Sequence, residues 1–260
     1  MIGKLGASIG ASAWLAASCA LAQPAATWTG PYAGVSLGVN LGHGRWTATS
    51  TSDLPGTIID ASSPRIYKPT GLRGGIIGGY NWQVGRWVVG PEVDVGLAKR
   101  RDVKAGLPGC AIDCAGAPGP GIDTSSLGVG WDASARARLG YLVSPNLLLY
   151  ATGGAAWQHV RVTGLCQANL TDPQCLVAPG DPILSEAHAR TLGGGTAGGG
   201  VEWALGGRWK MRAEYRRLML NSFSDAFFVG EPSFAPGVST YRFKVKPSAD
   251  IVTFGVTRRF

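Results

Sequence analysis

The stretch that decides the fold is residues 131–141, WDASARARLGY. Its odd positions are apolar, whereas its even positions are Asp, Ser, Arg, Arg and Gly, so hydrophobicity repeats with a period of two residues. This period indicates a β-strand with one apolar face and one polar face. The same alternation recurs at residues 89–97, 201–205 and 209–215. The sequence therefore predicts an all-β protein.

The composition supports this class. Glycine contributes 40 of the 260 residues, against a usual level of roughly 7%, and each glycine inside a helix costs roughly 1 kcal/mol relative to alanine. A helical fold is therefore disfavoured. The formal net charge is +8, but the positive residues stand singly among apolar ones. This distribution argues against a basic arm that binds nucleic acid.

Eight segments with the strand pattern can be delimited along the chain. They cover residues 31–46, 71–84, 87–99, 126–143, 147–162, 189–205, 209–220 and 248–260. Three connections are tight turns of typical turn residues, at 85–86, 144–146 and 206–208. The other four, near 47–70, 100–125, 163–188 and 221–247, are long and rich in Pro, Ser, Asp and Gly. Up-and-down pairing of the strands places all the long loops at one end.

Three features favour a membrane barrel over a soluble sandwich. Short and long connections alternate, as in outer-membrane barrels. The segments reach the roughly 9–11 residues that a tilted strand needs to cross the hydrocarbon. The last residue, Phe260, shares its face with the apolar residues of the final segment. Because lipid offers no water to backbone groups, the sheet edges must close, and an even number of strands can close. The prediction is an eight-stranded antiparallel up-and-down transmembrane β-barrel, with four long loops at one end and short turns at the other.

If the apolar faces meet lipid, the polar faces point into the barrel. This register predicts a lumen charge network formed by Glu92, Asp94, Asp132, Arg136, Arg138, Glu202, Lys210, Arg212, Glu214 and Arg216. Both signs occur in similar numbers, as a neutral interior requires. The opposite register would place three arginines in lipid, at a total cost of about 6–12 kcal/mol, which is comparable to the stability of a whole domain. The register is therefore well determined.

The first 22 residues have the pattern of a secretory signal peptide. One cation, Lys4, precedes an apolar run without acidic residues, and the run closes on a small-x-small pattern. Cleavage is expected near Ala22, which leaves residues 23–260 as the barrel. The alternatives are a lipoprotein acceptor at Cys19, although the residues before it lack the usual leucine, and an uncleaved membrane anchor.

Export changes how the remaining cysteines are interpreted. Cys110, Cys114, Cys166 and Cys175 form an even set in an oxidising compartment, which suggests disulfides. Local pairing of 110 with 114 and of 166 with 175 is the preferred one of the three possible connectivities. A zinc site is the alternative, but neither pair has a supporting histidine nearby.

Several short motifs, in their order and spacing, resemble a known family. They are WTGPYAG at 28–34, GGYNWQ at 78–83, RLGY at 138–141, LLYATGG at 148–154, GGGVEW at 198–203 and KMRAEY at 210–215. Together they resemble the alphaproteobacterial outer-membrane immunogenic proteins, a porin-like family of small barrels similar in fold to OmpA and OmpX. The resemblance spans nearly all of the mature chain and implies a barrel in the cell outer membrane of a Gram-negative bacterium.

The end of the chain resembles the signal that the outer-membrane assembly machinery recognises. Thr253, Gly255 and Phe260 match its polar, glycine and terminal aromatic positions. Arg258 stands where an aromatic residue is usual, which implies weaker recognition.

Three functional alternatives accompany the barrel. A lipid-modifying enzyme would need a His and a Ser together on a lipid-facing strand; His159 faces outward, but Arg161 stands two residues further on. A surface protein that binds haem or a host component could use Tyr67, Tyr241 and His188, which are scattered in the sequence. A small porin-like diffusion channel would need an open lumen, and charges paired across the lumen would instead plug it.

The sequence therefore predicts an integral outer-membrane β-barrel with a structural or surface-exposed role in the envelope and without catalysis. No catalytic residue, metal site or other cofactor is expected. The expected partners are membrane lipid, lipopolysaccharide and the outer-membrane assembly machinery, and nucleic acid is not among them.

Overall fold

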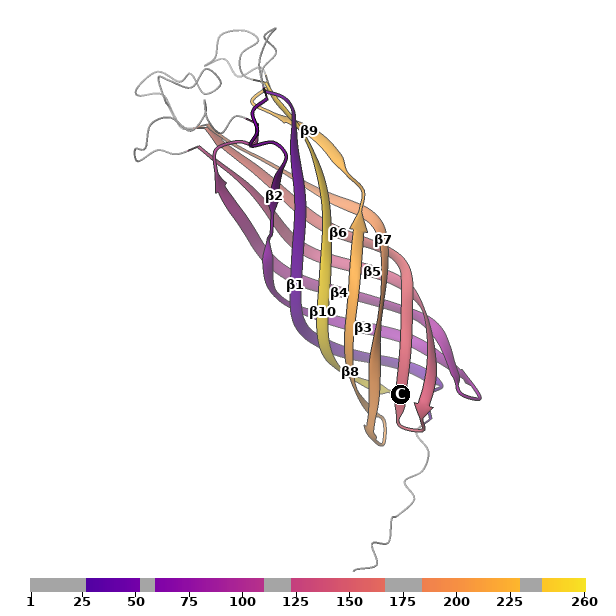
Figure 1. Ribbon diagram of the computed structural model, residues 1–260. Helices are drawn as coiled ribbons and strands as arrows, with labels where there is room; N and C mark the ends of the chain where they lie inside the picture. The colour runs from indigo at the N-terminus through magenta and orange to yellow at the C-terminus, as the bar shows by residue number, and fades with distance from the viewer. Residues whose placement is uncertain (1–26, 52–58, 110–122, 167–183, 230–239) are drawn as a thin grey trace, which may run out of the picture.

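The computed structural model describes residues 27–51, 59–109, 123–166, 184–229 and 240–260 (Figure 1). The regular elements of these ranges are all β-strands. They are β1 (Gly30–Ser50), β2 (Arg65–Tyr67), β3 (Thr70–Val84), β4 (Trp87–Ala105), β5 (Thr124–Ser144), β6 (Leu147–Cys166), β7 (Leu184–Gly206), β8 (Trp209–Leu220), β9 (Phe223–Phe227) and β10 (Tyr241–Arg259). In the described part of the chain, no helix is long and apolar enough to cross a membrane.

Eight of these strands form a closed ring. The strands β1, β3, β4, β5, β6, β7, β8 and β10 are joined in this order, and β10 pairs with β1 to close the wall. The two short strands continue interrupted wall strands: β2 pairs with β1 beyond the start of β3, and β9 pairs with β10 beyond the end of β8. The predicted eight-stranded antiparallel up-and-down barrel is confirmed.

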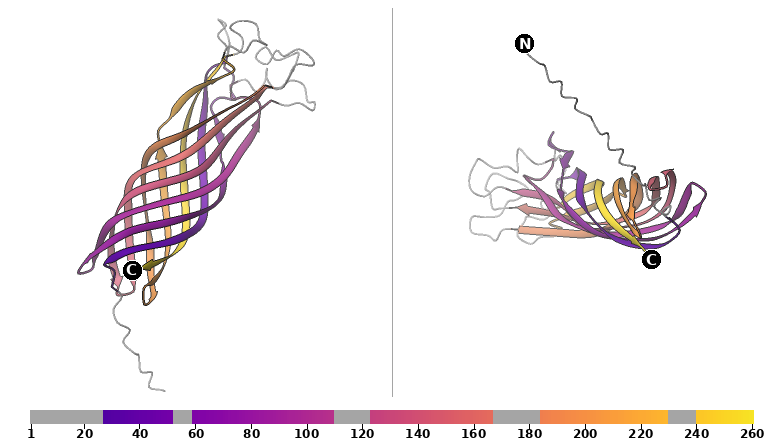
Figure 2. Two further views of the ribbon diagram at one scale, coloured as in Figure 1. Left: turned by 180° about the vertical axis from the view of Figure 1, so that it is seen from behind. Right: turned by 90° about the horizontal axis from the view of Figure 1, so that it is seen from below.

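The wall extends further than the sequence predicted, mainly toward the end with the long connections. The strand predicted at 87–99 runs to Ala105, the one at 189–205 begins at Leu184, and the one at 248–260 begins at Tyr241. Figure 2 shows the resulting long, strongly tilted strands from behind and from below.

The outer surface carries an apolar band of the height expected for an outer membrane. On β4 the outward positions from Trp87 to Leu97 are apolar and exposed, and the next outward residue is Lys99. Ten steps of ~3.3 Å give ~33 Å along the strand, and a tilt of ~40° converts this length to ~25 Å of height. The band ends at a similar level on β6, where Trp157 is followed by His159 and Arg161.

The interior changes in character along the barrel axis. At the turn end, Trp28, Val88 and Leu148 belong to a small buried apolar cluster. The middle contains the buried charged residues. At the loop end, a large apolar core includes Trp46 and Phe243, both completely buried. Above the membrane the outside of the wall meets water, so the inside must supply the apolar surface that folding requires.

Two of the three short turns depend on a glycine at their first position. Gly85 and Gly207 open the two-residue turns after β3 and β7 with φ values of 61° and 59°. Glycine adopts this left-handed conformation without steric cost, and the backbone twist of such hairpin turns matches the twist of the strands they join.

Candidate functional site

The charged residues of the lumen lie in two layers. The layer nearer the loop end contains Arg73, Arg216, Asp94 and Asp132. Arg73 contacts Asp94 at 2.8 Å and Asp132 at 2.6 Å. Arg216 lies 2.5 Å from Asp94 and 3.0 Å from Asp132. Two arginines therefore meet two aspartates, and the formal charge of this layer is zero.

The layer nearer the turns is built from three arginines and three glutamates. They are Arg136, Arg138, Arg212, Glu92, Glu202 and Glu214. Glu92 lies at its centre, 2.5 Å from Arg136 and 2.6 Å from Arg212. All six are buried, and this layer is also neutral. Buried charges are tolerated only when they are paired and hydrogen-bonded in this way.

Lys210 is buried nearer the turn end than these two layers, and its ammonium group contacts an aromatic ring. Its ammonium lies 3.9 Å from the centre of the Trp28 ring, a favourable cation–π geometry. All ten residues named from the sequence for the lumen network are buried, and nine of them lie in the two layers.

The sequence reasoning missed several members of this network, among them one arginine and two tyrosines. Arg73 lies between two carboxylates, Tyr32 donates a hydrogen bond to Glu92 at 2.8 Å, and Tyr150 donates to Glu214 at 2.9 Å. Arg73 alternates with Leu72 and Gly74, so the period-two pattern could have identified it. The tyrosines could not have been assigned in this way, because a tyrosine has both an apolar ring and a polar hydroxyl group and therefore suits either face.

The described lumen is closed above and below the ionic layers. The Trp46 ring packs against Phe243 with the ring centres 4.8 Å apart and against Tyr67 at 5.4 Å. Below the charges, Val88 and Leu148 are fully buried. An ion moving along the axis would therefore meet an apolar core, paired charges and a second apolar cluster in turn.

The residues considered for ligand binding lie within this architecture. Burial raises the pKa values of Tyr67 and Tyr241, and Tyr241 donates a hydrogen bond to the Pro108 carbonyl. His188 lies with its ring centre 5.1 Å from that of Phe227. The structure therefore gathers these residues, scattered in the sequence, around one core at the loop end, where they serve packing.

The same His188 forms part of a side-chain seam between β7 and β9, where no backbone ladder joins the two strands. Its Nδ1 lies 2.9 Å from Asp225, and Arg190 contacts the same carboxylate at 2.8 Å. Burial alone would raise the pKa of Asp225, but hydrogen bonds from the Ala226 amide, Arg190 and His188 hold it below its usual value.

In the described part of the chain, neither His159, considered above for catalysis, nor His188 forms a hydrogen bond with a serine. His159 faces outward, with Nδ1 3.3 Å from the Thr191 hydroxyl. The Nε2 atom of His188 lies 2.6 Å from Glu186, so both of its ring nitrogens face carboxylates. Within the described ranges, no group of three or more potential metal ligands occurs.

The other predicted features lie partly outside the described residues. Cys110, Cys114, Cys175 and the predicted signal peptide fall there, and Cys166 ends β6 without a described side chain. The disulfides therefore stay a prediction.

The residues of the predicted assembly signal lie on β10 and, for Phe260, directly after it. Thr253 is buried in the lumen, whereas Phe260 is 59% exposed on the outside. Arg258 lies against the Trp209 ring at 5.7 Å.

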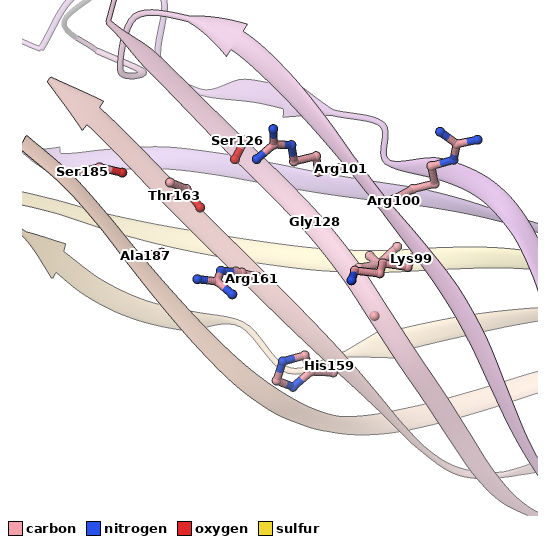
Figure 3. A pocket seen from close by; sticks show the side chains of 12 residues that line it. Lys99, Arg100, Arg101, Ser126, Gly128, His159, Arg161, Thr163, Ser185 and Ala187 are labelled. Atoms are coloured by element: carbon pink, nitrogen blue, oxygen red, sulfur yellow. The ribbon is translucent and has the colours of Figure 1, made fainter. Parts of the chain in front are cut away.

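A hollow of about 780 Å³ opens on the outer surface, at the level where the apolar band ends (Figure 3). Residues of β4, β5, β6 and β7 line it. Its lining residues include the basic residues Lys99, Arg100, Arg101, His159 and Arg161, and none of the described lining residues carries a carboxylate.

A closed wall with an apolar exterior and a neutralised ionic interior defines an integral β-barrel of the outer membrane. The chain belongs to the outer membrane protein beta-barrel domain family, whose model matches residues 10–260. It is 28% identical over 220 residues to the 31 kDa outer-membrane immunogenic protein of Brucella melitensis, covering 80% of this chain and 82% of the relative. It is 30% identical over 198 residues to the 22 kDa outer membrane protein of Rhizobium leguminosarum bv. viciae, covering 75% and 65% of the two chains. The predicted family and the location in the cell outer membrane are confirmed.

Solved structures with a similar arrangement share little sequence with this chain. The attachment invasion locus protein Ail of Yersinia pestis is 12% identical, with a TM-score of 0.40 and coverage of 89% of this chain and 99% of Ail. Neisserial surface protein A is 11% identical, with a TM-score of 0.36 and coverage of 89% and 98%.

Proposed function

We propose that this protein is a closed, non-catalytic barrel that serves the envelope structurally and displays its long loops at the cell surface. The observation that carries the proposal is the filling of the lumen, in which two neutral ionic layers lie between two apolar clusters. An eight-stranded barrel has an interior just wide enough for its own side chains, and here these side chains meet across the axis.

The same arrangement argues against a diffusion channel. A conducting path would have to separate contacts such as Arg136–Glu92 and Arg73–Asp132, which are buried and hydrogen-bonded. Breaking one buried pair costs ~3–5 kcal/mol, and the path would also have to open the core around Trp46.

The remaining parts of the proposal concern partners. The chain is expected to enter the membrane through its C-terminal signal at Thr253, Gly255 and Phe260, which the assembly machinery would bind. In the outer leaflet it would contact lipopolysaccharide. The exposed apolar band on the wall supports contact with acyl chains, and the basic residues above the band support contact with phosphorylated head groups.

Single-channel recording in planar bilayers tests the closed-barrel proposal. The purified full-length mature protein is reconstituted beside a general diffusion porin, which shows that the bilayers report conduction. We expect the porin to give regular unitary current steps and this protein to give none. Regular steps of one size from the folded, heat-modifiable wild-type protein would overturn the proposal.

A further inference from the structure

The basic hollow on the outer wall has an arrangement that the lumen does not explain. The strand ladders place its outward residues in rows that cross β4, β5 and β6. In one row, Arg101 pairs with Gly128, and Gly128 pairs with Arg161. Two spacings of ~4.8 Å separate the two arginine backbones by ~10 Å, and the glycine between them has no side chain to fill that space.

The neighbouring rows extend the same pattern. Below it, Gly130 lies beside His159, since an added Cβ at Gly130 would approach His159 Cδ2 to 3.3 Å. Above it, the Ser126–Thr163 pair contributes two hydroxyl groups. The hollow therefore has cations at its sides, a backbone floor on β5, and hydroxyl groups along its upper edge.

Two irregularities of the wall create this depression. The ladder between β4 and β5 shifts between Leu97 and Arg100, and the ladder between β5 and β6 shifts between Val129 and Asp132. Such bulges redirect side chains and bend the strand. Both occur where the outer surface changes from apolar to basic, so the depression lies at the interface between lipid and water.

The charges of the hollow lack local compensation. In the described part of the chain, no ion pair involves Lys99, Arg101 or Arg161. By contrast, Arg217 on the opposite side of the barrel contacts Asp250 at 3.2 Å. Uncompensated cations around a space of this size favour an anionic ligand with more than one hydrogen-bond acceptor.

We infer that this hollow binds the phosphorylated sugar head group of an outer-leaflet glycolipid. The acyl chains of such a lipid lie along the apolar band below Leu97 and Trp157, and its phosphates lie between Lys99, Arg101 and Arg161. The inference rests on the proposed outer-membrane contact with lipopolysaccharide and assigns that contact a place on the wall. Phosphate is the recognised chemistry, and the lipid anchor distinguishes this ligand from a free anion.

Native mass spectrometry in a non-ionic detergent tests the site with three probes: bisphosphorylated lipid A, dephosphorylated lipid A and inorganic phosphate. The wild-type protein is expected to bind the bisphosphorylated lipid in preference to the dephosphorylated one. The variant K99Q/R161Q is expected to bind it about thirtyfold more weakly, equivalent to ~2 kcal/mol for two interfacial cations.

Two further variants isolate the cause. R86Q/R208Q removes the same charge from the turns at the opposite end of the barrel and should keep wild-type affinity. Gly128→Leu keeps every charge but fills the floor between the arginines, and it should weaken binding at least tenfold. Heat-modifiability on gels verifies that each variant is folded and membrane-competent. The single-channel recordings test the closed barrel separately, so the failure of one proposal can be distinguished from the failure of the other.

Four outcomes would overturn the assignment. They are wild-type affinity in K99Q/R161Q, wild-type affinity in Gly128→Leu, an equal loss in R86Q/R208Q, and competition by inorganic phosphate at concentrations as low as those of lipid A. The last result would mean that the hollow takes a soluble anion and that the lipid assignment is wrong.

Discussion

Glu92 is the position at which the ionic interior can be tested most directly. Its carboxylate lies 2.5 Å from Arg136, 2.6 Å from Arg212 and 3.7 Å from Arg138, and the residue is 1% exposed. Glu92→Gln keeps nearly the same volume but leaves three arginines facing two glutamates. The layer then contains an uncompensated positive charge that water cannot reach.

Breaking a buried ion pair in this way costs ~3–5 kcal/mol, a large part of the ~5–15 kcal/mol that stabilises a typical folded protein. Asp250→Asn is the matched control, because Asp250 contacts an arginine whose side chain is 52% exposed, at 3.2 Å. Removing an exposed pair changes stability by ~0–1 kcal/mol.

The assay is equilibrium unfolding by guanidinium in lipid vesicles, followed by tryptophan fluorescence and by heat-modifiability on gels. We expect the free energy of unfolding to fall by ~3–5 kcal/mol for Glu92→Gln and by less than ~1 kcal/mol for Asp250→Asn. In the double variant E92Q/R212M the layer regains neutrality, so its loss should fall short of the sum of the single losses by ~1–3 kcal/mol. Equal losses in the two single variants, or strict additivity in the double variant, would refute the neutral-layer reasoning.

Three further predictions concern wall closure, the loop-end core and pH. An added Cβ at Gly38 would lie 1.9 Å from a backbone oxygen of β10, so Gly38→Ala should lower the free energy of unfolding by ~1–3 kcal/mol or more, whereas Gly74→Ala, whose Cβ would have 3.6 Å of space, should change it little. Phe243→Ala should cost ~3–5 kcal/mol and speed proteolysis at the loop end while membrane insertion persists; unchanged proteolysis would contradict the packing described. Because the pKa of Asp225 is lowered, its contacts stabilise the β7–β9 seam fully above the ordinary value near 4 and are lost as the pH falls toward the lower, folded value. Protease cleavage at this seam should therefore rise below about pH 4, and Asp225→Asn should remove that pH dependence.

In the loop-end half of the barrel, the sequence contains a further signal, which is a change in the side of each strand that is apolar. On β6 the exposed large apolar side chains, Leu149 and Trp157, stand at odd positions, whereas Val160 and Val162 beyond them are buried at even positions and alternate with polar outward residues. On β10 the apolar side chains at even positions such as Phe254 face outward, while Phe243 and other odd positions are buried. The apolar side of a strand thus switches where the outer solvent changes from lipid to water. A prediction that keeps the apolar side of each strand the same along its whole length therefore ends the strands near this switch.

The sequence by itself determined the class, the strand order and the inward face of each membrane-spanning segment. These follow from local rules, since the period of two fixes the two faces and the cost of arginine in lipid fixes which face is inside. The alternation within residues 131–141 is enough to place Arg136 and Arg138 in the lumen.

Only the tertiary structure decided which charges meet and where the outer wall is hollow. Glu92 and Arg212 lie 120 residues apart in the chain, and their contact depends on the register of every ladder between their strands and on ring closure by β10. The hollow likewise depends on two bulges and on Gly128 of β5 lying between Arg101 of β4 and Arg161 of β6. Lateral register and bulges arise from the packing of the whole ring, so the alternation within a single strand does not encode them.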